Sequence, residues 1–143
     1  MEKNEFGPEH EYRFLVVESY LDTFGHMNNA IYLTLFEEAR WDIITAGGYG
    51  LDVIQELKIG PIITSVSVQY KREIKNREWI TIRSRLKSVQ SKIMTMQQIM
   101  INERNEEACV AEFSFGLFDM KLRKLISPSE KWLSSLGVSP NSH

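Results

Sequence analysis

Apolar residues recur along this chain at two different spacings. Between residues 12 and 16 they occupy every second position, which predicts a strand that leads toward Asp22. From residue 31 they recur at helical spacing, and one helical face collects Ile31, Tyr32, Leu35, Phe36, Ala39, Ile43 and Ala46. Asn28 or Asn29 is a natural N-cap for this helix, and Gly47-Gly48 is a natural end. The pattern therefore predicts a strand, a turn and then a long helix.

Four later stretches, 62–70, 80–87, 93–101 and 109–117, alternate apolar with more polar residues. A period of two residues is typical of a strand with one buried face, and short turns between these stretches favour antiparallel neighbours. Residues 129–136 are expected to form a short helix, with Ser127 as its cap and Pro128 at its first position. The predicted fold class is α+β, with one buried helix against an antiparallel sheet of about five strands.

The long helix carries further apolar residues, Leu33, Trp41 and Ile44, on its other side, so we expect other elements to wrap it. A single helix cannot cover such a sheet on both faces. We therefore expect the second face or an edge to pair with another subunit, most simply about a two-fold axis.

The composition is that of an ordinary globular protein. With 143 residues, 43% hydrophobic and 25% charged, the chain is expected to form one domain over 1–143, with a loose arm at 1–8 and a frayed tail at 138–143. A net charge of −2 gives no general attraction for nucleic acid or membranes. The single cysteine, Cys109, excludes an internal disulfide and suits a reducing compartment. No segment resembles a signal sequence or a spanning helix, so we expect a cytoplasmic protein.

The most informative segment is Asp22-Thr-Phe-Gly-His-Met-Asn-Asn29, at the predicted junction of strand and helix. A helix start offers unpaired backbone N–H groups and a partial positive charge. An Asp beside such donors could attack an acyl carbonyl, or activate water against it, while the donors hold the carbonyl oxygen. The alternative is structural: Asp22 is then a turn residue, Asn28 and Asn29 are caps, and His26 sets the turn through a hydrogen bond.

Together with the adjoining helix that carries Phe-Glu-Glu-Ala-Arg40 and the four strands that follow, this segment resembles the hot-dog-fold thioesterases. The branch it resembles is the 4-hydroxybenzoyl-CoA thioesterase-like acyl-CoA thioesterases, and the order of elements fits from about residue 10 to 125. The resemblance implies a long central helix wrapped by the sheet, a homodimer or homotetramer, and acyl-CoA bound at a subunit interface. It implies hydrolysis of a fatty or aromatic acyl-CoA to free acid and CoA, without metal or redox cofactor.

Carried over to this chain, the resemblance makes Asp22 the catalytic residue, as nucleophile or as general base. Gly25 matches the turn glycine, and His26, Asn28 and Asn29 match the segment that opens the helix. Backbone N–H groups from Asn28 to Ala30 would polarise the thioester carbonyl.

The sequence also departs from the family pattern. Tyr20 stands where many relatives carry a second acidic residue, and the segment 72–78 lacks the Pro and Gly-Asp that relatives often have there. Phe24 replaces an asparagine of the similar motif in acyl-ACP thioesterases, which makes a carrier-protein substrate a less favoured alternative. A non-catalytic acyl-thioester-binding protein on the same fold is the other alternative, because fold does not establish function.

Eight of the chain's 17 basic residues lie between positions 71 and 92, where only Glu73 and Glu78 oppose them. This window is either a solvated strand face or a site for the phosphates of coenzyme A, which arginine and lysine favour. The candidates for substrate binding are Arg83, Arg85, Ser88, Ser91 and Lys92, in addition to Gly25 and Ala30. Exposed aromatics are not interleaved with the basic residues, which disfavours nucleic acid.

The remaining residues that could carry chemistry are expected to have structural roles. Glu37 and Glu38 on the long helix are expected to be solvated or interface-paired, with Glu38 as the reserve general base. Cys109 and the methionines Met94, Met96 and Met100 are expected to be buried packing residues. Three scattered histidines give no metal-ligand pattern.

Overall fold

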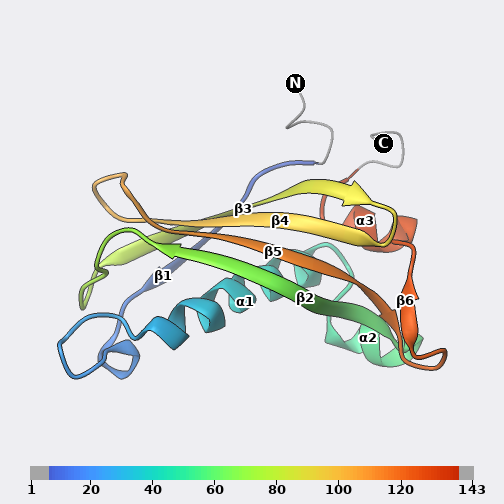
Figure 1. Ribbon diagram of the computed structural model, residues 1–143, viewed down its shortest axis with the longest axis horizontal. Helices are drawn as coiled ribbons and strands as arrows, with labels where there is room; N and C mark the ends of the chain where they lie inside the picture. Colours follow the sequence, from blue (N-terminus) through green and yellow to red (C-terminus); the bar gives the residue numbers. More distant parts are fainter. Residues whose placement is uncertain (1–6, 139–143) are drawn as a thin grey trace.

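The computed structural model describes residues 7–138 and contains one antiparallel sheet with a long helix packed on it (Figure 1). The strands lie in the order β1-β3-β4-β5-β2, and β6 pairs with β5. Their bounds are β1 His10–Leu15, β2 Ile59–Tyr70, β3 Trp79–Gln90, β4 Ile93–Ile101, β5 Glu107–Asp119 and β6 Lys124–Ile126. The helices are α1 Asn29–Ala46, α2 Leu51–Leu57 and α3 Glu130–Ser135, with a short 3-10 turn at Glu18–Tyr20. The predicted α+β class is confirmed.

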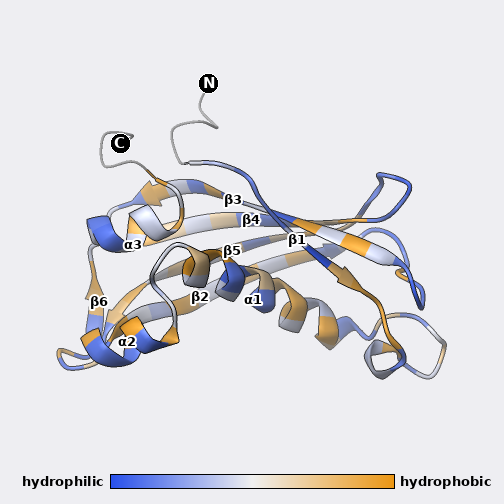
Figure 2. Cartoon of the chain, turned by 180° about the vertical axis from the view of Figure 1, so that it is seen from behind, coloured by the Kyte–Doolittle hydropathy of each residue, from blue (hydrophilic) through white to orange (hydrophobic). Residues whose placement is uncertain are grey.

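Helix α1 has the bounds that its apolar spacing predicted. The Asn28 side chain caps it by accepting a hydrogen bond from the Ala30 N–H at 2.8 Å. Its buried face, which includes Leu35, Phe36 and Ala39, packs on the sheet residues Ile80, Ile82, Met100 and Phe113. Figures 1 and 2 show α1 across one face of the sheet, with α2 and α3 beside its C-terminal end.

The back of α1 is only partly covered within the described residues. Ile44 is buried in the cluster that contains Trp132 of α3, whereas Leu33 and Trp41 stay 39% and 37% exposed. Ala46 was predicted on the core face but is exposed, because α3 covers the Ile44 side of the helix end instead. Within the described residues of one chain, other elements therefore cover the helix at Ile44 but not at Leu33 and Trp41.

Short elements account for most differences from the sequence prediction. Strand β6, with three residues, and helix α2, with seven, are too short to show a clear period. Helix α3 is capped by Ser129, whose Oγ accepts from the Trp132 N–H at 3.1 Å, so Pro128 precedes the cap and Ser127 is not the cap. Val138, assigned to the tail, is buried with Trp132. The rest of the predicted arm and tail, 1–6 and 139–143, lies outside the described residues, whereas Gly7 lies against Gly137.

Among the strands of residues 7–138, β2 forms one edge of the sheet and pairs with β5 alone. A bulge between Ile63 and Ser65 shifts its alternation, so Ile63 and Val66 both lie opposite buried phenylalanines of β5 and share the face toward α1. Ile63 and Val66 are nevertheless 41% and 43% exposed. Strand β2 and the back of α1 therefore present an uncovered apolar surface. Within residues 7–138, no helix combines the length and apolarity needed to cross a bilayer.

Candidate active site

The turn from Asp22 to His26 is built around one carboxylate oxygen. Asp22 Oδ1 accepts hydrogen bonds from the backbone N–H of Phe24 at 2.9 Å and of His26 at 3.2 Å. Gly25 has a φ of +83°, a left-handed conformation that glycine adopts without strain. No hydrogen bond of residues 7–138 uses Asp22 Oδ2. One oxygen of this carboxylate therefore holds the turn, while the other remains available for chemistry.

Most backbone N–H groups at the start of α1 already have acceptors. The Asn28 N–H donates to Tyr20 O at 2.8 Å, and the Ala30 N–H donates to the Asn28 side chain. Among the described hydrogen bonds, none uses the N–H of Asn29. Of the backbone N–H groups from Asn28 to Ala30 that were predicted to polarise a carbonyl, the one left without an acceptor in the described residues is therefore that of Asn29. It lies at the positive end of the helix.

Asp22 and the helix start open into a cavity of about 400 Å³. The sequence-predicted residues His26, Asn28 and Asn29 line it, together with Lys71 and Arg72 from the basic window. The lining residues that sequence reasoning did not assign to a site are Met27, Tyr32, Tyr70 and Glu73. The added residues from 70 to 73 end β2 and lead out of it. Hydrogen bonding of the Met27 N–H to Ile74 O at 3.0 Å holds this segment against the Asp22 turn.

Two tyrosines form one wall of the cavity. The Tyr70 hydroxyl donates to Asn29 O at 3.1 Å, and its ring meets Tyr32 edge to face at 4.8 Å between centroids. Burial raises the pKa of Tyr32 to about 12, with smaller contributions from Cys109 and Tyr70. The Tyr32 hydroxyl therefore stays protonated at neutral pH and can donate a hydrogen bond.

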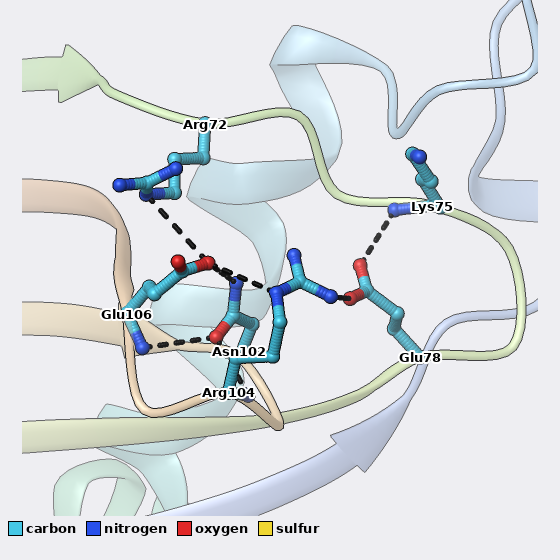
Figure 3. A network of polar contacts seen from close by, with 6 residues as sticks. All are labelled: Arg72, Lys75, Glu78, Asn102, Arg104 and Glu106. Atoms are coloured by element: carbon cyan, nitrogen blue, oxygen red, sulfur yellow. Dashed lines mark hydrogen bonds and ion pairs between the residues drawn. The ribbon is translucent and has the colours of Figure 1, made fainter.

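An ion-pair network holds the segment after β2 to the β4–β5 turn (Figure 3). Glu106 Oε1 accepts from Asn102 at 3.0 Å and from Arg104 at 3.1 Å, and it lies 3.8 Å from Arg72 Nε. The Asn102 hydrogen bond is the largest of the effects that lower the pKa of Glu106, followed on the lowering side by Arg104. Glu78 accepts from the Lys75 N–H at 2.9 Å and faces Arg104 at 3.9 Å. These contacts fix the loop that carries Arg72 and Glu73 beside the cavity.

Comparison with known proteins assigns the chain to a family. The family model of the thioesterase-like superfamily matches residues 16–136. This chain belongs to the thioesterase-like superfamily. The long-chain acyl-CoA thioesterase FadM of Escherichia coli K12 is 29% identical over 112 residues, which cover 76% of this chain and 82% of FadM.

Two solved structures share the fold of this superfamily member. The Staphylococcus aureus protein SAV2348, solved in complex with CoA, aligns with a TM-score of 0.85 at 14% identity and covers 95% of this chain and 89% of its own. YbaW, a probable thioesterase from Escherichia coli, aligns with a TM-score of 0.80 at 24% identity, over 90% of this chain and 97% of its own. The predicted hot-dog fold is confirmed.

The basic window does not form an unpaired basic surface in this thioesterase-like chain. Arg83, Arg85 and Lys87 lie on the sheet face away from α1 and pair with Glu11, Glu9 and Glu112 at 3.3, 3.4 and 3.5 Å. Lys71 likewise faces Glu107 at 3.4 Å. Of the basic residues in the window, Lys71 and Arg72 are the ones that line the Asp22 cavity.

Ser88, Ser91 and Lys92 lie at the other end of the sheet. They belong to the end of β3 and the hairpin that follows, which Figure 1 shows beside α3, whereas the Asp22 turn lies at the opposite end. A β-strand rises about 3.3 Å per residue, so the length of β3 separates them from the Trp79 end near the turn. One protomer therefore does not bring these residues, or the paired Arg83 and Arg85, to Asp22.

The glutamates of α1 also lie away from Asp22. Glu38 accepts a hydrogen bond at 3.1 Å from the hydroxyl of Tyr12 on β1, and Glu37 lines a second, mostly apolar cavity of about 110 Å³.

Arg40 lies at the edge of this second cavity. Its guanidinium donates to Gln98 at 2.8 Å and lies over the Phe113 ring, and burial lowers the pKa of Arg40 to about 10. The remaining lining residues are Trp41, Ile44, Pro61, Ile63, Met96, Phe115, Trp132 and Leu136. Cys109, Met94, Met96 and Met100 are buried as predicted.

Proposed function

We propose that this chain hydrolyses acyl-CoA thioesters to free acid and CoA, with Asp22 at the centre of the reaction. The observation that carries the proposal is the juxtaposition of Asp22 Oδ2 and the Asn29 N–H, two groups without protein partners in the described residues, on one cavity. Membership of the thioesterase-like superfamily and the similarity to FadM support the same reaction.

In the proposed reaction, the thioester carbonyl oxygen accepts a hydrogen bond from the Asn29 N–H. This places the oxygen that becomes negative at the positive end of α1, and one such preorganised donor is typically worth about 10²–10³ in rate. Asp22 then either attacks the carbonyl carbon, giving a mixed anhydride that water hydrolyses, or takes a proton from a water that attacks directly. In both routes the C–S bond breaks and CoA leaves as a thiolate, which needs no strong general acid. Neither route calls for a metal or a redox cofactor.

The other predicted site residues have supporting roles in this proposal. Asn28 caps α1, Gly25 shapes the Asp22 turn, and Ala30 lies in the first helical turn beside the donor at Asn29. Lys71 and Arg72 are the cavity's candidates for the phosphates of CoA, since guanidinium and ammonium groups bind phosphate well. Arg83, Arg85, Ser88, Ser91 and Lys92 can contribute to CoA binding only from a second protomer.

We propose a fatty rather than an aromatic acyl group as the preferred substrate. FadM is named as a long-chain acyl-CoA thioesterase, and the second cavity offers an apolar end point for a long chain. Trp41 lies 12 residues after Asn29 on α1, so this cavity is about 18 Å along the helix from the proposed carbonyl site. An extended chain advances roughly 1.2 Å per bond, so about 15 bonds span that length.

The uncovered apolar surface of β2 and α1 supports a homo-oligomer, in the simplest case a homodimer. An exposed edge strand with apolar side chains is a ready site for pairing with a second copy. Ile63, Val66 and Tyr70 of β2 and Trp41 of α1 would be buried in that interface. The cytoplasm is the proposed location, because the one thiol of the sequence, Cys109, is unpaired and suits a reducing compartment.

The deciding experiment measures thiol release from short, long and aromatic acyl-CoAs by the wild type and by Asp22→Asn. We expect wild-type turnover on fatty acyl-CoAs and a loss of at least ~100-fold in the folded variant. Equal rates would remove Asp22 from the reaction. Binding without turnover would favour the non-catalytic alternative, and turnover restricted to a matched acyl-ACP would favour the carrier-protein alternative.

A further inference from the structure

Glu73 is the carboxylate on the wall of the Asp22 cavity that the proposed reaction leaves unused. It lies in the loop after β2, next to the buried Ile74, whose carbonyl accepts from the Met27 N–H at 3.0 Å. A second backbone contact, a bridge between His26 and Lys75, lies just beyond it. The main chain therefore holds Glu73 directly against the turn that carries Asp22 and His26.

The side chain of Glu73 contacts His26. Glu73 Oε1 lies 3.2 Å from His26 Nε2, with the two side chains 61% and 39% exposed. The paired glutamates nearby face stronger cations: Glu78 faces Arg104, Glu106 faces Arg72 and Arg104, and Glu107 faces Lys71. Glu73 is thus the member of this group that meets an imidazole, at the edge of the cavity.

An exposed pair of this kind contributes little to folding stability. Its consequence lies in the ring, because a carboxylate oxygen 3.2 Å from Nε2 favours, in a neutral imidazole, the tautomer that carries its proton on that nitrogen. Nδ1 is then the acceptor nitrogen. The backbone N–H of the same residue donates to Asp22 Oδ1 at 3.2 Å, so His26 is fixed to Asp22 through its main chain and to Glu73 through its ring.

We propose that Glu73 is a positioning residue that holds the His26 ring at the Asp22 cavity, with Nδ1 as a hydrogen-bond acceptor for water or substrate. This inference rests on the proposed thioesterase function for its effect on rate. Its structural content, the orientation of the ring, does not depend on turnover.

A double-mutant cycle tests the effect on rate. We expect Glu73→Ala to lower kcat about three- to tenfold with KM changed less than about twofold, and to have no further effect in a His26→Ala background. The matched control is Glu112→Ala, which removes an equally exposed ion pair to Lys87 at 3.5 Å on the far face of the sheet and should leave kcat unchanged. The same loss in both backgrounds, or an equal loss in Glu112→Ala, would overturn the proposal.

Relaxation of the His26 ring carbons in NMR tests the positioning without any substrate. The wild-type ring should be ordered, with an order parameter near that of the rigid backbone at about 0.85, and Glu73→Ala should lower it below about 0.6 while backbone signals from 22 to 27 keep their positions. Glu73→Gln should restore much of the order, because its amide oxygen can occupy the same position beside Nε2. Equal ring order in wild type and Glu73→Ala would refute the inference, whether or not the wild type hydrolyses thioesters.

Discussion

Comparing Gly25→Ala with a matched glycine variant should separate two effects of the substitution. One is the loss of folding stability caused by backbone strain, and the other is the loss of activity caused by a displaced Asp22. Gly25 has a φ of +83°, and a Cβ built on it meets no atom within 4 Å. Gly48, just after α1, has a φ of +92° and equally open surroundings. Both alanine variants therefore carry the same kind of strain without a clash. Placing an L-residue in the left-handed region costs about 1–2 kcal/mol.

This cost can be converted into a change in melting temperature. For 143 residues the entropy of unfolding is about 0.3 kcal/mol/K, so 1–2 kcal/mol lowers Tm by about 3–7 °C. We expect Gly25→Ala and Gly48→Ala to melt within about 2 °C of each other in thermal unfolding followed by circular dichroism. Gly25→Asn should lose less, because asparagine tolerates this conformation better than alanine.

Activity should distinguish the two positions. Gly25 lies between Asp22 and His26, so a relaxed turn moves the carboxylate relative to the Asn29 N–H, whereas Gly48 lies beyond the other end of α1. We expect kcat/KM to fall at least ~10-fold in Gly25→Ala and to stay within about twofold in Gly48→Ala, because small displacements of reacting groups are costly. Equal activity in the two variants, at equal stability, would refute the argument that this turn positions Asp22.

Three other predictions concern the second cavity, the exposed strand and the thiol. Ile63→Trp should fill the cavity of about 110 Å³ and lower turnover of long-chain more than of short-chain acyl-CoAs, and equal losses across a chain-length panel would contradict that use of the cavity. Val66→Glu should convert the proposed dimer into monomers in light scattering, and a wild type that is monomeric at micromolar concentration would contradict the interface. Burial raises the pKa of Cys109 to about 12, so the native thiol should react with Ellman's reagent far more slowly at pH 8 than the denatured thiol; equal rates would contradict its burial.

The parts of the fold that the sequence predicted well are those with long, uniform periods. The bounds of α1 were predictable because an apolar stripe, an asparagine cap and two glycines agree over one segment. Ala46 was assigned to the wrong environment, whereas Ile44 is covered as expected, because α3, nearly ninety residues later, decides which side of the helix end is buried. The short elements α2 and β6 lack the length from which a period can be recognised.

The basic window shows why charge counted along the sequence is a poor guide to surface charge. Glu73 and Glu78 are the carboxylates within the window, but Arg83 faces Glu11 of β1, Arg85 faces Glu9 just before β1, and the side chain that faces Lys87 comes from β5. Cross-strand neighbours in an antiparallel sheet are set by pairing, so sequence distance carries no information about them. The same reasoning explains the missed cavity residues, since Tyr70 and Glu73 are brought to Asp22 by long-range contacts such as the pairing of Met27 with Ile74.

The structural and catalytic interpretations of Asp22 are not alternatives, because they use different oxygens. Oδ1 accepts the Phe24 and His26 N–H groups, and an asparagine oxygen can accept both in the same geometry. Asp22→Asn should therefore keep the turn and its Tm within about 2 °C while replacing the reactive oxygen with an amide nitrogen, whereas Asp22→Ala removes the turn as well. A large loss of activity in Asp22→Ala alone would locate the importance of this residue in the turn. The same loss in a thermally unaltered Asp22→Asn would locate it in the chemistry of Oδ2.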